Sequence, residues 1–239
     1  MPRVVVLGCG TGVGKTRVCV ALLQQLARIG QACIGLKPIE SGIAAQDSPC
    51  PQPPPGSDAS ALAEAGSLHV TTEPHPLYAL ARPISPHLAA REMGLEIAPE
   101  AVVRWVASVE HAVTPLVTSD MAFWTIIETA GGVFSPLSRG ATNLDLARAL
   151  EPAIWILVAG DSLGVLHEVS ATLQAMRAHG RTPEHVVLSA AREPDASTGS
   201  NAAELEALGI VTPTTVLERD DDRGVQSLVK CLVAGERPT

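Results

Sequence analysis

Lysine and aromatic residues are scarce in this chain. It has 239 residues but only three lysines, Lys15, Lys37 and Lys230, and aromatic side chains make up 3% of the total. The formal net charge of −8 disfavours nucleic acid as a main partner, because binding a phosphate backbone requires a basic face. A full core can still form, since 46% of the residues are hydrophobic. Built from aliphatic side chains, such a core suits a parallel sheet that is buried on both faces.

Paired cysteines and long apolar runs are also missing. The five cysteines are Cys9, Cys19, Cys33, Cys50 and Cys231. Their number is odd and no CxxC pair occurs, so we expect neither a disulfide framework nor a zinc site, and the composition fits a reducing cytoplasm. The apolar run at residues 4–7 is too short for a signal-peptide core. No stretch approaches the roughly 20 apolar residues of a membrane span.

Short β-branched runs alternate with helical patterns along the chain. Strands are expected at residues 4–7, 32–36, 121–127, 153–159, 186–189 and 210–217. Helices are expected at residues 15–29, 57–65, 99–113, 165–179, 202–208 and from 224 onward, and the proline-rich stretch 48–56 reads as a loop. This order predicts an α/β fold with a doubly wound, mostly parallel sheet flanked by helices, in one domain over residues 1–239.

Unusual sequences follow four of these expected strands. They are GCGTGVGKT at residues 8–16, KPIESG at 37–42, ETAGG at 128–132 and AGDSLG at 159–164. Ligands of open α/β sheets bind beyond the carboxyl ends of the strands. If these four ends point the same way, they form one site.

The first of these sequences predicts a P-loop. An expected strand precedes it and an expected helix follows. In that context Gly-Lys-Thr is a specific signal for phosphate binding. Backbone N–H groups of Gly12, Val13 and Gly14 would then face nucleotide phosphates, Lys15 would reach the β- and γ-phosphates, and Thr16 would place its hydroxyl on Mg²⁺. The loop is one residue longer than the common form, because Gly8 lies six residues before Gly14.

Several motifs together resemble those of the dethiobiotin synthetase family. The loop is similar to that family's G-x-D-T-x-V-G-K-T, and KPIESG to its K-P-V/I-x-S-G. The family's S-D-A, P-x-S-P-H and E-G-A-G-G-x-x-x-P-L resemble residues 57–59, 83–87 and 128–137. An L-G pair resembles residues 163–164. The chain departs from the pattern at Gly10 (usually Asp), at Thr129 (usually Gly), at His167-Glu168 (commonly Asn-His) and at Ser189, near which an Asn is expected.

This resemblance implies a reaction and a P-loop NTPase-like fold. Family members use ATP and Mg²⁺ to join CO₂ to 7,8-diaminononanoate through a carbamate and a carbamic-phosphoric anhydride, giving dethiobiotin. Lys37, Lys15 and Thr11 are the expected catalytic residues. The expected nucleotide contacts are Gly12, Val13, Gly14, Lys15, Thr16, Glu128, Gly131 and Ser189. The expected substrate contacts within the same subunit are Ser41, Gly131 and Gly132. The others come from a second subunit, which implies a homodimer, and they are Gly164, Val165 and Leu166.

Two carboxylates are candidates for Mg²⁺ beside Thr16. Glu128 ends an apolar strand, where a charge is costly unless it is paired or bound to metal. It could instead cap a loop or helix. Asp58 follows Ser57, and the two also make a good helix N-cap pair. Thr11 and Ser41 could equally be turn-formers.

Other functions remain as alternatives. A regulatory P-loop ATPase would be expected to carry an extra lysine where Gly10 stands, or an amphipathic basic helix. An amide synthetase of the cobyrinate type would need a glutaminase domain, for which 239 residues leave no room. A degenerate homologue would bind nucleotide without turnover. The sequence leaves the nucleotide base and the exact diamine open.

Overall fold

A six-stranded parallel sheet forms the centre of the computed structural model, which describes residues 1–43, 53–69, 75–117 and 123–235. Its strands are β1 (Arg3–Gly8), β2 (Ala32–Leu36), β5 (Phe123–Glu128), β8 (Ile154–Asp161), β9 (His185–Ala190) and β10 (Thr214–Leu217). They lie in the order β10-β9-β8-β1-β5-β2, and each adjacent pair is parallel. The predicted α/β fold with a mostly parallel sheet is confirmed.

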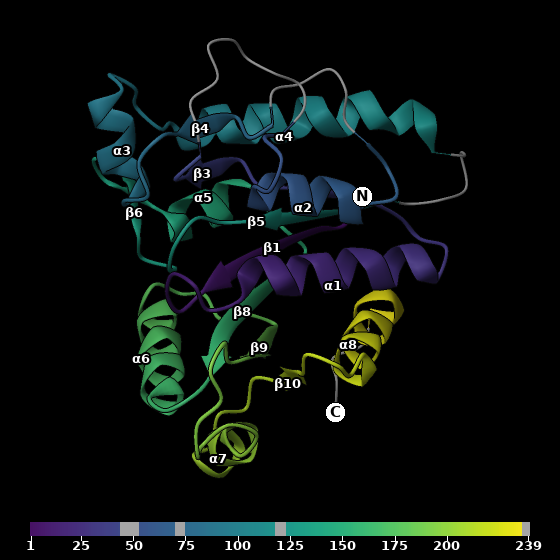
Figure 1. The fold of residues 1–239 in the computed structure, drawn as a ribbon, viewed down its shortest axis with the longest axis vertical. Helices are drawn as coiled ribbons and strands as arrows, with labels where there is room; N and C mark the ends of the chain where they lie inside the picture. The colour runs from purple at the N-terminus through teal and green to yellow at the C-terminus, as the bar shows by residue number, and fades with distance from the viewer. Residues whose placement is uncertain (44–52, 70–74, 118–122, 236–239) are drawn as a thin grey trace.

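Helices cover both faces of this sheet (Figure 1). They are α1 (Lys15–Arg28), α2 (Asp58–Ala65), α3 (Pro86–Glu92), α4 (Pro99–Val113), α5 (Asn143–Ala149), α6 (Val165–Ala178), α7 (Asn201–Ala207) and α8 (Arg223–Ala234), with a 3₁₀ turn at Thr114–Leu116. Side chains of β1 alternate between the faces, as the pleat requires. Val4 and Val6 pack with α1, α2 and α8, whereas Val5 and Leu7 pack with the cluster that includes α4, α5 and α6.

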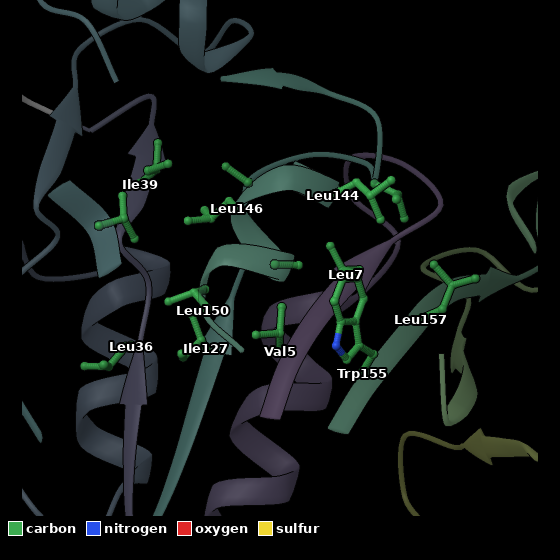
Figure 2. Packing of buried hydrophobic residues seen from close by; sticks show 14 of the residues in the cluster. Val5, Leu7, Leu36, Ile39, Ile127, Leu144, Leu146, Leu150, Trp155 and Leu157 are labelled. Carbon is green, nitrogen blue, oxygen red and sulfur yellow. The ribbon is translucent and has the colours of Figure 1, made fainter. Parts of the chain in front are cut away.

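The cluster that contains Val5 and Leu7 packs the carboxyl end of β1 against its neighbours. Val5, Leu7, Ile127 and Trp155 come from three adjacent strands, and α5 packs on them through its leucines (Figure 2). In the strand order, β1 has β5 on one side and β8 on the other, and the chain visits the two sides in turn. The carboxyl end of β1 therefore lies at the point where the strand order reverses, which is the usual ligand position in such sheets.

Several elements differ from the sequence-based prediction. The last strand begins at Thr214 and not at 210, because Val211 is 84% exposed and Pro213 has no N–H to donate to a ladder. The third main strand is described from Phe123; the predicted residues 121 and 122, and 48–52 of the proline-rich loop, lie outside the described residues.

Two helices and four short strands were not predicted. The helices are α3 and α5. Two short parallel strands, β3 (Ile39–Ser41) and β4 (Tyr78–Leu80), pair beside the main sheet, and β6 (Pro136–Ser138) forms a hairpin with β7 (Ala141–Thr142). Strands of two or three residues leave no readable periodicity. In the described part of the chain, no helix has the length and apolar character needed to cross a membrane.

Candidate active site

The loop between β1 and α1 has the backbone of a phosphate cradle. Gly12 and Gly14 have φ angles of +75° and +96°, a region that glycine enters without strain. A Cβ on Gly14 would lie 2.3 Å from the Ser189 hydroxyl oxygen, whereas one on Gly12 would meet nothing within 4 Å. The loop ends at the N-terminus of α1, where backbone N–H groups and the helix dipole favour an anion.

Lys15 lies over this loop and is nearly buried. Its Nζ donates to the carbonyl oxygen of Gly10 at 2.9 Å, and 6% of the residue is exposed. Burial lowers the pKa of Lys15, although the Glu128 charge opposes that effect. The ammonium is therefore a cation with few solvent partners, close to where phosphates would lie.

A compact polar cluster joins the ends of three elements to this loop. Thr16 Oγ1 donates to Glu128 Oε1 at 3.0 Å, and Lys37 Nζ donates to the same oxygen at 2.7 Å. Lys37 Nζ also donates to Asp58 Oδ2. These side chains come from α1, the residue after β2, the first residue of α2 and the last residue of β5. The strand ends that were expected to converge after the first, second and third main strands do so here.

Burial and neighbouring charges act in opposite directions on the pKa values of the two buried ionisable residues of this cluster. Lys37 is 5% exposed and Glu128 is 1% exposed. Burial by itself would lower the pKa of Lys37, but the Glu128 and Asp58 charges outweigh it and raise that pKa above its ordinary value. Burial raises the pKa of Glu128, against the opposing effect of Lys37. Lys37 therefore remains a cation at any physiological pH.

Three buried side-chain oxygen atoms have no hydrogen-bond partner among the described residues. They are Oε2 of Glu128, the hydroxyl oxygen of Ser41 at the end of β3, and Oδ1 of Asn143. Buried polar atoms are almost always satisfied, so the unsatisfied oxygen of Glu128, beside the P-loop residue Thr16, fits a site that receives a polar ligand. Among the described residues, no three His, Cys, Asp or Glu side chains gather as a metal site.

The segment after β5 is held against the P-loop. Asn143 Nδ2 donates to the carbonyl oxygens of Ala130 and Gly132 at 2.6 and 2.8 Å. A Cβ on Gly132 would lie 3.0 Å from the Cys9 carbonyl oxygen, and one on Gly131 would lie 3.7 Å from Thr11 Oγ1. No local pattern in the sequence marks Asn143, which sets this close approach. A cavity of about 400 Å³ lies here, lined by Cys9, Gly10, Thr11, Gly132, Val133, Phe134, Ser135, Pro136 and Thr172.

The fourth expected strand end, at the end of β8, lies at the same edge of the sheet as the end of β1, but its carboxylate bonds to the segment that leads into α7. The Asp161 carboxylate, at the end of β8, accepts from Asn201 Nδ2 at 2.6 Å and from the Gly199 N–H at 2.8 Å. Gly164 then caps the start of α6, and the Val165 N–H donates to the Ser162 carbonyl oxygen. Gly164, Val165 and Leu166 thus lie at the start of a helix, as predicted, and the Val165 N–H bonds within this turn and not to the polar cluster.

Ser189 lies at the end of β9, next to Gly14. Arg17 Nη1 donates to its hydroxyl oxygen at 3.4 Å and to the Leu217 carbonyl oxygen at 3.0 Å. The guanidinium of Arg17 thereby ties α1 to the ends of β9 and β10. This arginine was not singled out in the sequence, because nothing local marks its long-range contacts.

Comparisons with known proteins agree with this geometry. A family model described as an AAA domain matches residues 2–224. The ATP-dependent dethiobiotin synthetase BioD of Anaeromyxobacter dehalogenans (strain 2CP-C) is 33% identical over 232 residues, which is 96% of each chain. The chain belongs to the dethiobiotin synthetase family. A second dethiobiotin synthetase, from Nitrosospira multiformis, is 35% identical over 173 residues, covering 72% of this chain and 69% of its own.

Solved structures share the fold of this synthetase family member. The MinC:MinD cell division protein complex of Aquifex aeolicus aligns with a TM-score of 0.55 and 8% identity, covering 100% of this chain and 98% of the other. HypB from Helicobacter pylori aligns with a TM-score of 0.54 and 13% identity, covering 99% and 87%. At such low identity the likeness concerns the fold alone, and it confirms the predicted P-loop NTPase-like architecture.

Proposed function

We propose that this chain catalyses the ATP-dependent formation of dethiobiotin from 7,8-diaminononanoate and CO₂. The observation that carries the proposal is the buried cluster in which Lys37 contacts both Asp58 and Glu128 beside the P-loop residue Thr16. It is made of the residues through which the chain resembles the synthetase family. The cysteines that the structure describes are free, which fits the cytoplasmic location that we propose for the chain.

The reaction requires positioning and charge neutralisation more than covalent help. One amine takes up CO₂ as a carbamate and releases a proton. A carbamate oxygen attacks the γ-phosphorus of ATP, and ADP leaves. The second amine then attacks the carbonyl carbon of the resulting carbamic-phosphoric anhydride, closing the ring and releasing phosphate. The transferring phosphoryl group needs cations around it and an aligned nucleophile.

Lys37 supplies one of these cations. The two carboxylates keep it protonated and point its ammonium into the cluster. A fixed cation at this position stabilises the negative charge that the carbamate and γ-phosphate share in the transition state. Lys15 supplies the second cation, since its flexible stem lets Nζ move from the Gly10 carbonyl to the β- and γ-phosphates. Thr11 lies beside Gly131, where the carbamate would meet the loop.

The cluster also suits Mg²⁺. Thr16 offers a hydroxyl and Glu128 an unsatisfied buried oxygen, while Asp58 provides a second carboxylate. These hard oxygens are few, as Mg²⁺ prefers when phosphates and waters complete its shell. When bound, the ion neutralises charge on the phosphates. The protein's part is to hold the three side chains together at the ends of β5, α1 and α2.

The substrate would lie between the P-loop and the segment after β5. Ser41 offers a buried hydroxyl, and Gly131 and Gly132 let backbone approach closely. The tail carboxylate of the diamine would be held at the start of α6, by Gly164, Val165 and Leu166 of a second subunit, because a helix N-terminus attracts anions. The active form would then be a homodimer.

The experiment is phosphate release from ATP by purified protein with Mg²⁺ and bicarbonate, with and without 7,8-diaminononanoate. We expect release that depends on the diamine, with dethiobiotin in the product. Release that ignores the diamine would point to a regulatory ATPase, and nucleotide binding without release would point to a degenerate homologue.

A further inference from the structure

Glu40 links the segment after β2 to the start of α2. It lies on β3 and is 5% exposed. Its Oε1 accepts from the Asp58 N–H at 2.8 Å, and its Oε2 accepts from the Ala59 N–H at 2.9 Å. Hydrogen bonds to an ionised carboxylate are about twice as strong as those between neutral groups. The motif shared with the synthetase family, K-P-V/I-x-S-G, leaves this position open.

The hydrogen bonds around α2 account for each N–H at its start. The first donors of a helix have no partner within it. Here Ser57 N–H donates to the Pro54 carbonyl oxygen at 3.1 Å, and the Ser60 N–H donates to Ser57 Oγ at 3.0 Å. Glu40 takes the two N–H groups between them. Capping is therefore done by Ser57 and Glu40, and the Asp58 carboxylate bonds to Lys37 instead.

Asp58 needs this support because of where it is. It is the first residue of an eight-residue helix, and 46% of its side chain is exposed. Isolated helices of this length are marginal, and their first turn frays most easily. Without Glu40, two unpaired N–H groups would lie next to the Asp58 carboxylate and compete with Lys37 and Mg²⁺ for its oxygens.

We propose that Glu40 is a positioning residue, which fixes the backbone of Asp58 so that its carboxylate faces Lys37 and the metal position. The inference rests on the proposed function, since it assigns Asp58 to the Mg²⁺ site described above. Glu40 acts through Asp58 and touches no reacting atom. Outer groups that orient a metal ligand commonly change metal affinity or activity by about 10- to 100-fold when they are removed.

The test compares Glu40→Ala with Ser57→Ala. Both variants remove caps from the same helix, but only the first removes the acceptor of the Asp58 N–H. Two quantities are measured: the Mg²⁺ concentration that half-saturates ATP binding, and the one that half-saturates diamine-dependent turnover. We expect Glu40→Ala to raise both by at least about tenfold, and Ser57→Ala to change them by less than about twofold.

Further variants separate positioning from folding. Glu40→Gln keeps one carbonyl acceptor, so its Mg²⁺ requirement is expected to lie between those of the parent protein and Glu40→Ala. In an Asp58→Asn background, Glu40→Ala is expected to add little, because the residue that it positions is already impaired. Additive effects, or equal shifts in Glu40→Ala and Ser57→Ala, would overturn the proposal. If the parent protein shows no diamine-dependent turnover, the proposed function fails, yet Mg²⁺-dependent ATP binding still tests Glu40.

Discussion

Lys37 and Glu128 form an ion pair, 2.7 Å from Nζ to Oε1, because of the register between two strands. β2 and β5 are adjacent, and Leu36 pairs with Ile127. The residue that follows each of them is therefore Lys37, directly after β2, and Glu128, the last residue of β5. A slip of one residue would turn side chains to the opposite face and separate the pair. The sheet itself thus places the charges that we assign to phosphoryl transfer.

Replacing Lys37 tests its role in the reaction. In Lys37→Ala the P-loop is untouched, so ATP affinity is expected to change by no more than a few-fold. Turnover is expected to fall by about 10²- to 10³-fold, as for the loss of other groups that stabilise transition-state charge. Equilibrium ATP binding and dethiobiotin formation measure the two effects. A loss of ATP affinity equal to the loss in kcat/KM, with turnover at saturation kept, would show that the role is wrong.

The same variant has a cost in stability. It leaves Glu128 buried without the ammonium that is paired with it, and breaking a buried pair in this way costs about 3–5 kcal/mol. Denaturant unfolding measures this loss. Lys230→Ala is the matched control, because Lys230 is an exposed residue of α8 and its removal is expected to leave both stability and turnover unchanged.

The proposed role of Glu128 in binding Mg²⁺ can be tested by removing its charge. In Glu128→Gln the shape of the side chain is kept, but its charge is lost. We expect the Mg²⁺ concentration for half-maximal turnover to rise by at least about tenfold. A Mg²⁺ titration of turnover at saturating ATP measures it. Glu92→Gln is a suitable control, since Glu92 pairs with Arg82 at the surface. An unchanged Mg²⁺ requirement would remove Glu128 from the metal site.

Acid should destabilise the protein through His75. This residue is 4% exposed, its Nε2 accepts from the Lys37 N–H at 3.1 Å, and its ring lies 5.7 Å from that of Trp105. Burial lowers the pKa of His75 to about 4, below the ordinary value of about 6.5. The unfolded chain therefore binds more protons between these values, so stability falls as pH falls through that window.

The size of this effect can be measured against a variant. Between pH 7 and pH 5, His75 is expected to contribute a loss of about 2 kcal/mol in the free energy of unfolding. His75→Asn keeps a hydrogen-bond acceptor but does not titrate, so its stability should fall less over the same range. Urea unfolding at both pH values gives the comparison. Equal losses in the two proteins would mean that His75 is not the titrating group.

The positions that sequence predicted and those that it missed differ for a physical reason. Local pattern places four of the predicted residues at one edge of a parallel sheet. Two of them open a helix, one directly follows an apolar strand and one ends such a strand: Lys15 and Thr16, Lys37, and Glu128. Glu40 and Asn143 act through hydrogen bonds to the backbone of other segments. Their partners depend on how short elements such as β3 and α5 fold onto the sheet, which local pattern does not reveal.

Thr129 shows how a departure from the family motif can be structural. Its Oγ1 donates to the Val6 carbonyl oxygen at 3.1 Å, and the residue is 2% exposed. The hydroxyl therefore ties β5 to β1 and is not directed at the polar cluster. Restoring the family residue with Thr129→Gly should remove that bond and loosen the backbone, which lowers stability by about 1–2 kcal/mol. Thr129→Ser keeps the hydroxyl and is expected to lose less.

Turnover decides whether this reading of Thr129 is correct. The side chain of Thr129 bonds to the backbone of β1, and substitutions outside the reacting groups act mainly on stability. We therefore expect Thr129→Gly to keep kcat and the KM for ATP within about twofold, at a temperature where the variant is folded. Steady-state kinetics of dethiobiotin formation, with folding checked by circular dichroism, measure this. A rise in kcat would mean that Thr129 restrains the adjacent Glu128, and that the glycine of the family motif serves the reaction through the freedom it gives to the end of β5.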